Sequence, residues 1–229
     1  LVVTLVTVTN LLIAFFISGV VIWALGEDPW FALKTLLYGA FGYDEGLGYT
    51  LYYTTNFIFT GLAFAIGFHC GLFNIGAEGQ AYIGGLAVGL ICLWLENWPL
   101  LLVFPLAVTV SIIFGGIWGA IPGYLKAKRG SHEVVTTIMF NFIASVIMVD
   151  LLSHVLRPTG EMSPESRDFA ERVWVPQMHE IFNWFGINIT QTPLNGTFFF
   201  ALICLVLVWR FIWYTRWGYE IRTVGTNDT

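Results

Sequence analysis

The segment from Gly71 to Gln80 contains the first group of polar side chains that could bind a solute or an ion. Asn74, Glu78 and Gln80 put two amides and a carboxylate between two long apolar runs. Lipid cannot hydrogen-bond such groups, so a polar, glycine-rich segment is tolerated at membrane depth only where protein surrounds it or a water-filled cavity reaches it. The pattern therefore indicates the wall of a translocation path.

A second group lies at 131–141, at the start of another apolar run. Glu133, Thr137 and Asn141 are spaced four residues apart, which places them on one face of a helix. Local roles are also open, since Glu133 could favour the helix dipole behind a Ser131 cap and Thr137 could bond back to the preceding turn. Asn141 would lie about 12 Å inside the helix. An unpaired amide there would cost a few kcal/mol, so a purely local role is harder to assign to Asn141 than to Glu133 or Thr137.

Uncharged amides and a hydroxyl suit a neutral polar solute better than an ion, because they can both donate and accept hydrogen bonds. Glu78 is the exception. A half-helix that begins at Ala77 would lower the cost of its charge by placing it at the positive end of the helix dipole. The two groups together predict a path for a neutral polar solute.

The sequence carries none of the following motifs for enzymatic chemistry. The four histidines are dispersed and none belongs to an HExxH pair, the three cysteines lack metal-ligand spacing, and no lysine follows a glycine as a Walker A loop requires. We therefore predict no catalytic residue, no metal site and no cofactor on this chain. Any ATP and Mg²⁺ chemistry is expected on a separate subunit.

The elements that must position these residues are membrane helices. Hydrophobic residues make up 57% of the chain and charged residues 11%, against roughly 25% charged in soluble domains. The net charge of -5 argues against a nucleic-acid partner. Strand alternation is absent, so we predict an all-α polytopic protein surrounded by membrane lipid. Apolar runs of about 20 residues place six spanning helices at 1–25, 51–70, 78–96, 100–125, 133–156 and 197–215.

Small residues at four-residue spacing predict where two of these helices pack closely, because packing drives helix association in lipid. The rows are Ala81, Gly85 and Gly89 in the third helix, and Gly115, Gly119 and Gly123 in the fourth.

The positive-inside rule predicts the sidedness. Basic residues concentrate at 126–129 and 210–222, whereas acidic residues concentrate in 26–50 and 157–196. We therefore expect 126–132 and 216–229 in the cytoplasm and the two acidic loops on the outer side.

Three stretches, in order, resemble the signatures of one family. They read LFNIGAEGQ at 72–80, HEVVTTIMFNFIA at 132–144 and RWGYEIRTVGTN at 216–227. The chain resembles bacterial ABC transporter permeases of the branch that imports nucleosides and simple sugars, related to the ribose and branched-chain amino acid permeases. The second stretch is most similar to nucleoside permeases, and the similarity runs from about Gly26 to the last residue.

The resemblance implies import of nucleosides by alternating access, with no reaction catalysed by this chain. It implies three partners in the bacterial inner membrane or beside it: an ATP-binding cassette subunit, a second permease subunit of the same or a related sequence, and an external solute-binding protein. The residues that would line or face the path are Asn74, Glu78, Gln80, Glu133, Thr137 and Asn141.

The resemblance also implies that 1–229 is one permease domain that continues beyond its last residue. Within it, 217–227 resembles the cytoplasmic segment that docks into the ATP-binding subunit. Some relatives have Ala at the position of Thr223 and Pro at that of Asp228, and the second departure leaves the exact start of the docking helix open. The coupling positions are Glu220, Arg222, Gly225 and Asn227.

Several alternatives remain open. A simple-sugar or branched-chain amino acid permease would share these motifs, and an ion-coupled secondary transporter would use Glu78 as a titrating carboxylate. The geometry of 71–80 is open as well. In a tight cytoplasmic turn Asn74 and Glu78 would be solvated caps, whereas in a broken helix drawn into the membrane they would face the path. The ordered agreement of the three motifs favours the broken helix.

Overall fold

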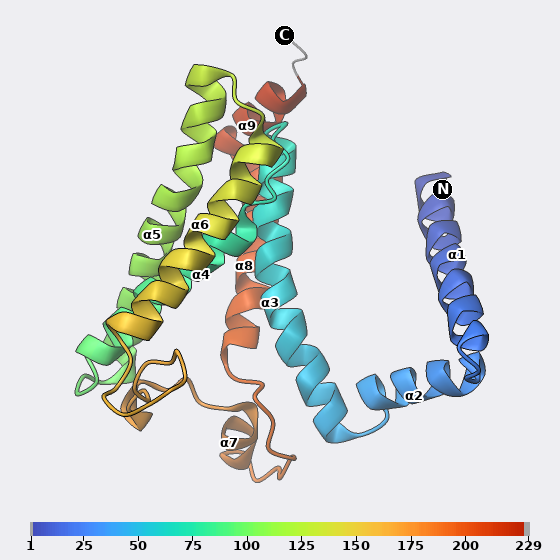
Figure 1. Cartoon of the computed structure of the whole chain (residues 1–229), viewed down its shortest axis with the longest axis horizontal. Coiled ribbons are helices and arrows are strands. Elements are labelled where there is room, and N and C mark those ends of the chain that lie inside the picture. The colour runs from blue at the N-terminus through green and yellow to red at the C-terminus, as the bar shows by residue number, and fades with distance from the viewer. Residues whose placement is uncertain (1, 227–229) are drawn as a thin grey trace. The chain divides into compact units, whose positions relative to one another are not determined.

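The long apolar runs become long helices in the computed structural model, which describes residues 2–226 (Figure 1). Six of the described helices are long and apolar enough to cross a membrane: α1, α3, α4, α5, α6 and α8. The predicted all-α class with six spanning helices is confirmed. The elements are α1 (Val2–Ala24), α2 (Pro29–Phe41), α3 (Asp44–His69), α4 (Ala77–Trp94), α5 (Leu100–Arg129), α6 (Glu133–His154), the 3-10 turn η1 (Glu171–Val173), α7 (Met178–Asn183), α8 (Thr197–Tyr214) and α9 (Arg216–Thr226).

The connection predicted as a loop at 26–50 is largely helical. Helix α2 begins at Pro29, where no backbone N–H is needed, and the Asp28 carboxylate accepts a hydrogen bond from the Trp30 backbone N–H at 2.9 Å. Helix α3 begins at Asp44 rather than at residue 51, with two carboxylates in its first turn. These capping signals lie outside the apolar runs, so the hydropathy pattern missed them.

The chain forms two compact units, and the candidate site lies in the second. In the first unit the Thr50 hydroxyl donates to the Ala40 carbonyl at 3.0 Å, which joins α3 to α2. The first unit consists of residues 1–54 and 177–194, and the second of 55–176 and 195–229.

In the second unit α4 packs against both α5 and α6. Its buried residues are Gly79, Ile83, Gly84 and Ala87, so the predicted contact row through Ala81 and Gly85 is wrong. Those two residues are exposed. The two rows share a four-residue spacing but lie about 200° apart around the helix, and spacing alone does not say which row faces a neighbour.

The corresponding row of α5 does face α4. A Cβ at Gly115 would lie 3.4 Å from the Gln80 carbonyl oxygen, and one at Gly119 would lie 2.9 Å from the Gln80 amide nitrogen. The absence of both side chains lets the start of α4 approach α5. Gly123, the third member, has no other described atom within 4 Å of its Cβ position.

Segments that the charge pattern assigns to one side gather at one end of the second unit. The end of α3, the turn between α5 and α6, and α9 lie together at the top of Figure 1. Leu72, Lys126 and Glu133 line one pocket there, and Gly225 of α9 lies against Gly71. This grouping is what the predicted topology requires.

Candidate functional site

The site is built around a break between two helices. Helix α3 ends at His69 and α4 begins at Ala77, and the residues between them are not helical. The Leu72 backbone N–H donates to the Gly67 carbonyl at 3.0 Å, which turns the chain back at the end of α3. The Asn74 side-chain oxygen then accepts from the Gly76 N–H at 2.9 Å, a local turn that precedes α4.

Asn141 of α6 holds the far end of this break. Its side-chain oxygen accepts from the Gly79 N–H at 2.9 Å, and its side-chain nitrogen donates to the Ile75 carbonyl at 2.9 Å. Asn141 therefore has the partners that its buried position requires. The Gly79 N–H is one of the donors that a helix start leaves unpaired, so Asn141 caps α4 from another helix.

These bonds also set the depth of the break. Asn141 lies eight residues after Glu133, the first residue of α6, which corresponds to about 12 Å along the helix. The segment Ile75–Gly79 thus enters the helix bundle instead of turning at the helix ends (Figure 1). Of the two alternatives for 71–80, this geometry matches the broken helix.

Close backbone approach fixes the break against α6. A Cβ at Gly79 would lie 2.9 Å from the Asn141 side-chain oxygen, and one at Gly76 would lie 3.1 Å from the Thr137 Cβ. The Thr137 hydroxyl donates back to the Glu133 carbonyl at 2.8 Å, which confirms the predicted local bond. Thr137 therefore presents its methyl face to the break while its hydroxyl is paired.

The predicted Ser131 cap of α6 is wrong. The residue directly before the helix is His132, and no side chain caps the first turn. The Ser131 hydroxyl is buried without a hydrogen-bond partner among the described residues. The left-handed Gly130 ends α5, and the Ser131 N–H is used to bond the Leu125 carbonyl at 3.4 Å, so Ser131 stands one position too early to cap α6.

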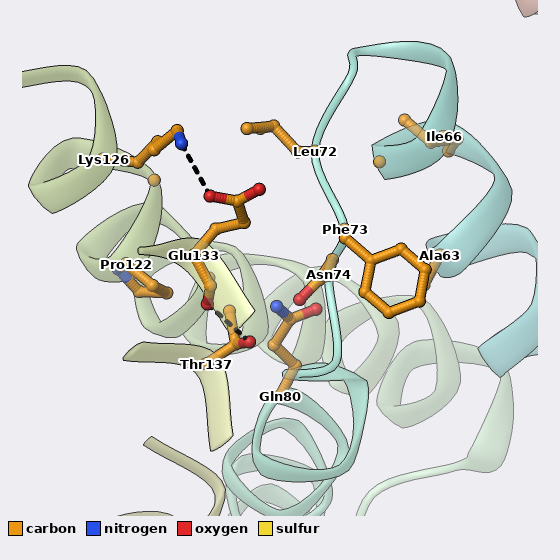
Figure 2. A pocket seen from close by; sticks show the side chains of 13 residues that line it. Ala63, Ile66, Leu72, Phe73, Asn74, Gln80, Pro122, Lys126, Glu133 and Thr137 are labelled. Atoms are coloured by element: carbon orange, nitrogen blue, oxygen red, sulfur yellow. Dashed lines mark hydrogen bonds and ion pairs between the residues drawn. The ribbon is translucent and has the colours of Figure 1, made fainter. Parts of the chain in front are cut away.

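A cavity of about 250 Å³ opens beside the break. Figure 2 shows the side chains that line it, which come from α3, the break, and the adjacent parts of α4, α5 and α6. Much of the lining is apolar, including Leu72, Phe73 and Pro122. The polar lining consists of Asn74, Gln80, Lys126, Glu133 and Thr137.

The charged residues of the lining neutralise each other. The Lys126 ammonium lies 2.7 Å from the Glu133 carboxylate, across the turn between α5 and α6 (Figure 2). Lys126 was not singled out from the sequence, although its position in the last turn of α5, seven residues before Glu133, was a usable signal. The cavity thus has a paired charge beside uncharged amides.

Gln80 is the lining residue with hydrogen-bonding capacity to spare. Its side-chain amide has no hydrogen-bond partner within the described part of the chain, and it lies in the space left by Gly119. A primary amide offers two donors and an acceptor. A ligand in the cavity would therefore meet an available amide at Gln80.

Not every predicted path residue lines the cavity. Four of them line it: Asn74, Gln80, Glu133 and Thr137. Asn141 does not, because its side chain is hydrogen-bonded to the backbone of Ile75 and Gly79. Glu78 is exposed on another face of α4, where its carboxylate accepts from the Tyr82 hydroxyl at 3.4 Å.

Three of the four predicted coupling residues, Glu220, Arg222 and Gly225, lie on α9. The Arg222 guanidinium carbon is 4.6 Å from the centre of the Trp213 ring, and Glu220 pairs with Arg216 at 3.5 Å on the exposed side. Gly225 packs on the end of α3. Asn227 lies outside the described residues.

Comparison with known proteins identifies relatives. Over 223 residues, or 97% of this chain, it is 30% identical to the nucleoside ABC transporter permease protein NupB of Lactococcus lactis subsp. cremoris. The guanosine ABC transporter permease protein NupP of Bacillus subtilis is 34% identical over 83% of the chain. The glucose ABC transporter permease protein TsgB13 of Haloferax volcanii is 27% identical over 96% of it.

The chain spans 61%, 52% and 58% of the lengths of these three relatives. No solved structure matches it. Residues 46–229 match the model of the family described as branched-chain amino acid transport system, permease component. With six helices suited to crossing the membrane among its described residues and a family match over most of its length, this chain is a multi-pass membrane protein that belongs to that permease family.

Proposed function

We propose that this chain is the membrane-spanning part of an ATP-driven importer and that the cavity beside the break is part of the path of a nucleoside. The observation that carries the proposal is the segment Ile75–Gly79, the end of the break and the first turn of α4, which Asn141 holds inside the bundle. It brings Asn74 and Gln80 to one cavity lined otherwise mostly by apolar side chains. Irregular backbone at membrane depth is tolerated where it lines such a space.

The chemistry of the lining suits an uncharged solute rich in donors and acceptors. The Lys126–Glu133 pair leaves no net charge on the lining, and the Gln80 amide can donate and accept at once. A nucleobase edge presents a donor beside an acceptor, which is the pattern that a glutamine amide pairs with in two bonds. The names of two relatives, a nucleoside permease and a guanosine permease, point the same way.

Energy and solute delivery would come from partners. ATP and Mg²⁺ would bind to a separate ATP-binding subunit that docks on α9, and an external binding protein would deliver the solute. A second permease subunit, identical or related, would complete the path. The chain itself would sit in the bacterial inner membrane and catalyse no reaction.

Uptake by the complete protein with its cognate partners in proteoliposomes tests this function. We expect ATP-dependent accumulation of radiolabelled guanosine or uridine in excess of glucose, ribose and leucine. Accumulation of glucose alone would favour the sugar permease that the Haloferax relative suggests. Uptake that continues without ATP and stops with a protonophore would overturn the ATP-driven mechanism in favour of ion coupling through a carboxylate such as Glu78.

A further inference from the structure

The ion pair of Lys126 and Glu133 neutralises its two charges without using all of its hydrogen-bonding capacity. One carboxylate oxygen of Glu133 lies 2.7 Å from the Lys126 ammonium, and the other oxygen points away from Lys126 (Figure 2). Apart from Lys126 and the backbone N–H of Glu133 itself, no described residue donates a hydrogen bond to this carboxylate. An ionised carboxylate has about four acceptor sites, so about two of them remain open.

These open acceptor sites can be reached from the cavity. Glu133 lines the cavity and its side chain is 21% exposed. Lys126 lines the cavity as well, with a side chain that is 42% exposed, and an ammonium has three donors, of which Glu133 needs one. The pair therefore offers acceptors and donors side by side. A hydroxyl group both donates and accepts, so hydroxyl groups fit this pair without bringing a net charge into the cavity.

The ion pair and the Gln80 amide lie at different depths of the cavity. The Gln80 amide nitrogen lies 2.9 Å from the position of a Cβ on Gly119, and Lys126 follows Gly119 by seven residues in α5. Seven residues correspond to about 10 Å along a helix. Pro122 and Gly123 line the cavity between these two levels and have no polar side-chain atom. A solute that meets both polar places must therefore carry hydrogen-bonding groups at its two ends.

A nucleoside has its polar groups divided in this way. Its base edge can pair with a glutamine amide through two hydrogen bonds, and its ribose carries two neighbouring hydroxyls at the other end. Dinucleotide-binding proteins use a carboxylate to bind a ribose hydroxyl. The open acceptor sites of Glu133 match a pair of neighbouring hydroxyls in the same way.

We infer that Glu133 binds the two vicinal hydroxyls of a ribonucleoside while Gln80 binds its base, so that the cavity selects solutes that carry both hydroxyls. Lys126 fixes the carboxylate beside the cavity and keeps the pair neutral overall. The inference rests on the proposed function for the class of solute, and it adds which end of the solute meets α6 and which chemical group is selected.

The test uses the complete protein with its ATP-binding subunit and cognate binding protein in proteoliposomes. We compare kcat/KM for uptake of radiolabelled uridine with that of 2′,3′-dideoxyuridine, which has the same base and lacks both hydroxyls. The ratio of the two values is measured for the parent, Glu133→Ala, Glu133→Gln and the control Asp150→Ala. Asp150 is an exposed carboxylate of the same helix that does not line the cavity. Because all four proteins use the same binding protein, its own preference cancels when their ratios are compared.

We expect Glu133→Ala to lower the ratio of uridine to dideoxyuridine uptake about 12- to 140-fold, the range for loss of a hydrogen bond to a charged group. Glu133→Gln should lower it less, because its amide oxygen is a weaker acceptor, and this variant decides the question if Glu133→Ala does not assemble. Asp150→Ala should keep the parent ratio. A merely structural role of Glu133 would slow the uptake of both solutes alike.

Two results would overturn the inference. Uridine uptake by the parent with the same ratio in both Glu133 variants would overturn the role of Glu133 alone and leave the proposed function intact. Absence of uridine uptake in the parent would overturn the proposed function and this inference with it.

Discussion

Asn141 shows how one residue can determine both the stability and the shape of the site. Both ends of its amide are bonded to the break, one to the Gly79 N–H and one to the Ile75 carbonyl. An amide is the side chain that can donate and accept from one planar group at this spacing. The sequence showed that an unpaired amide at Asn141 would be costly, but not that its partners would be the backbone groups of Gly79 and Ile75.

Asn141→Leu should destabilise the protein. It leaves the buried Gly79 N–H and the part-buried Ile75 carbonyl unpaired, and an unpaired group costs roughly 1–3 kcal/mol where it is fully buried. In a protein of this size that corresponds to a loss of about 2–4 °C in melting temperature for each kcal/mol, measurable by thermal unfolding in detergent. Asn56→Leu, at an exposed amide of α3, is the matched control and should melt near the parent temperature. Equal melting temperatures for the two variants would contradict the capping role.

Gln80→Leu tests the contact of the available amide with solute. Loss of one hydrogen-bonded partner to a desolvated polar solute costs about 1–3 kcal/mol, so we expect KM for nucleoside uptake to rise about 5- to 150-fold, at unchanged protein levels. Glu78→Gln, two residues away but outside the cavity, should leave KM nearly unchanged. The assignment of Gln80 to the solute fails if the two variants transport alike.

Among the helices, α4 is the one whose packing most directly shapes the candidate site. Its buried row through Gly79, Ile83 and Ala87 meets α5 and α6, while Ala81 and Gly85 are exposed on another face. The helix has only 18 residues, or about 27 Å, because its first turn begins within the bundle.

Two glycine substitutions on α4 should have opposite effects. A methyl group at Gly79 would lie 2.9 Å from the Asn141 side-chain oxygen and 3.0 Å from its Cα, so Gly79→Ala should cost about 1–3 kcal/mol by overpacking. Gly85→Ala meets nothing within 4 Å and should be neutral or stabilising by up to about 1 kcal/mol, through helix propensity. Thermal unfolding of both variants measures the difference. If Gly85→Ala were the less stable of the two variants, this would contradict the observation that Gly79 is buried and Gly85 is exposed.

On the scale of the whole molecule, the charge pattern and the structure agree on which segments share an end. The turn after α5, the break and α9 lie together, and the loop after α6 carries the acidic residues predicted for the outer side. The positive-inside rule then assigns the gathered end to the cytoplasm.

Cysteine labelling in intact cells checks this orientation. In a background without native cysteines, Lys128→Cys and Met162→Cys place exposed thiols after α5 and after α6 respectively. We expect a membrane-impermeant maleimide to label only position 162 in cells whose outer membrane is permeabilised and whose inner membrane is intact. Position 128 should be labelled only after lysis. The reverse pattern would invert the topology and place α9 on the wrong side for an ATP-binding partner.

The membrane class, the six spanning helices and the shared face of Glu133, Thr137 and Asn141 could be predicted from the sequence alone, which also singled out 71–80 as a candidate site. These follow from hydropathy and helical period, which are properties of neighbouring residues. Only the tertiary structure decided that Asn141 caps α4, that Glu78 lies outside the cavity while Gln80 lies inside it, and that Gly225 meets Gly71. Those facts depend on which helix faces meet. Contacts between residues more than sixty positions apart cannot be predicted from the spacing of neighbouring residues.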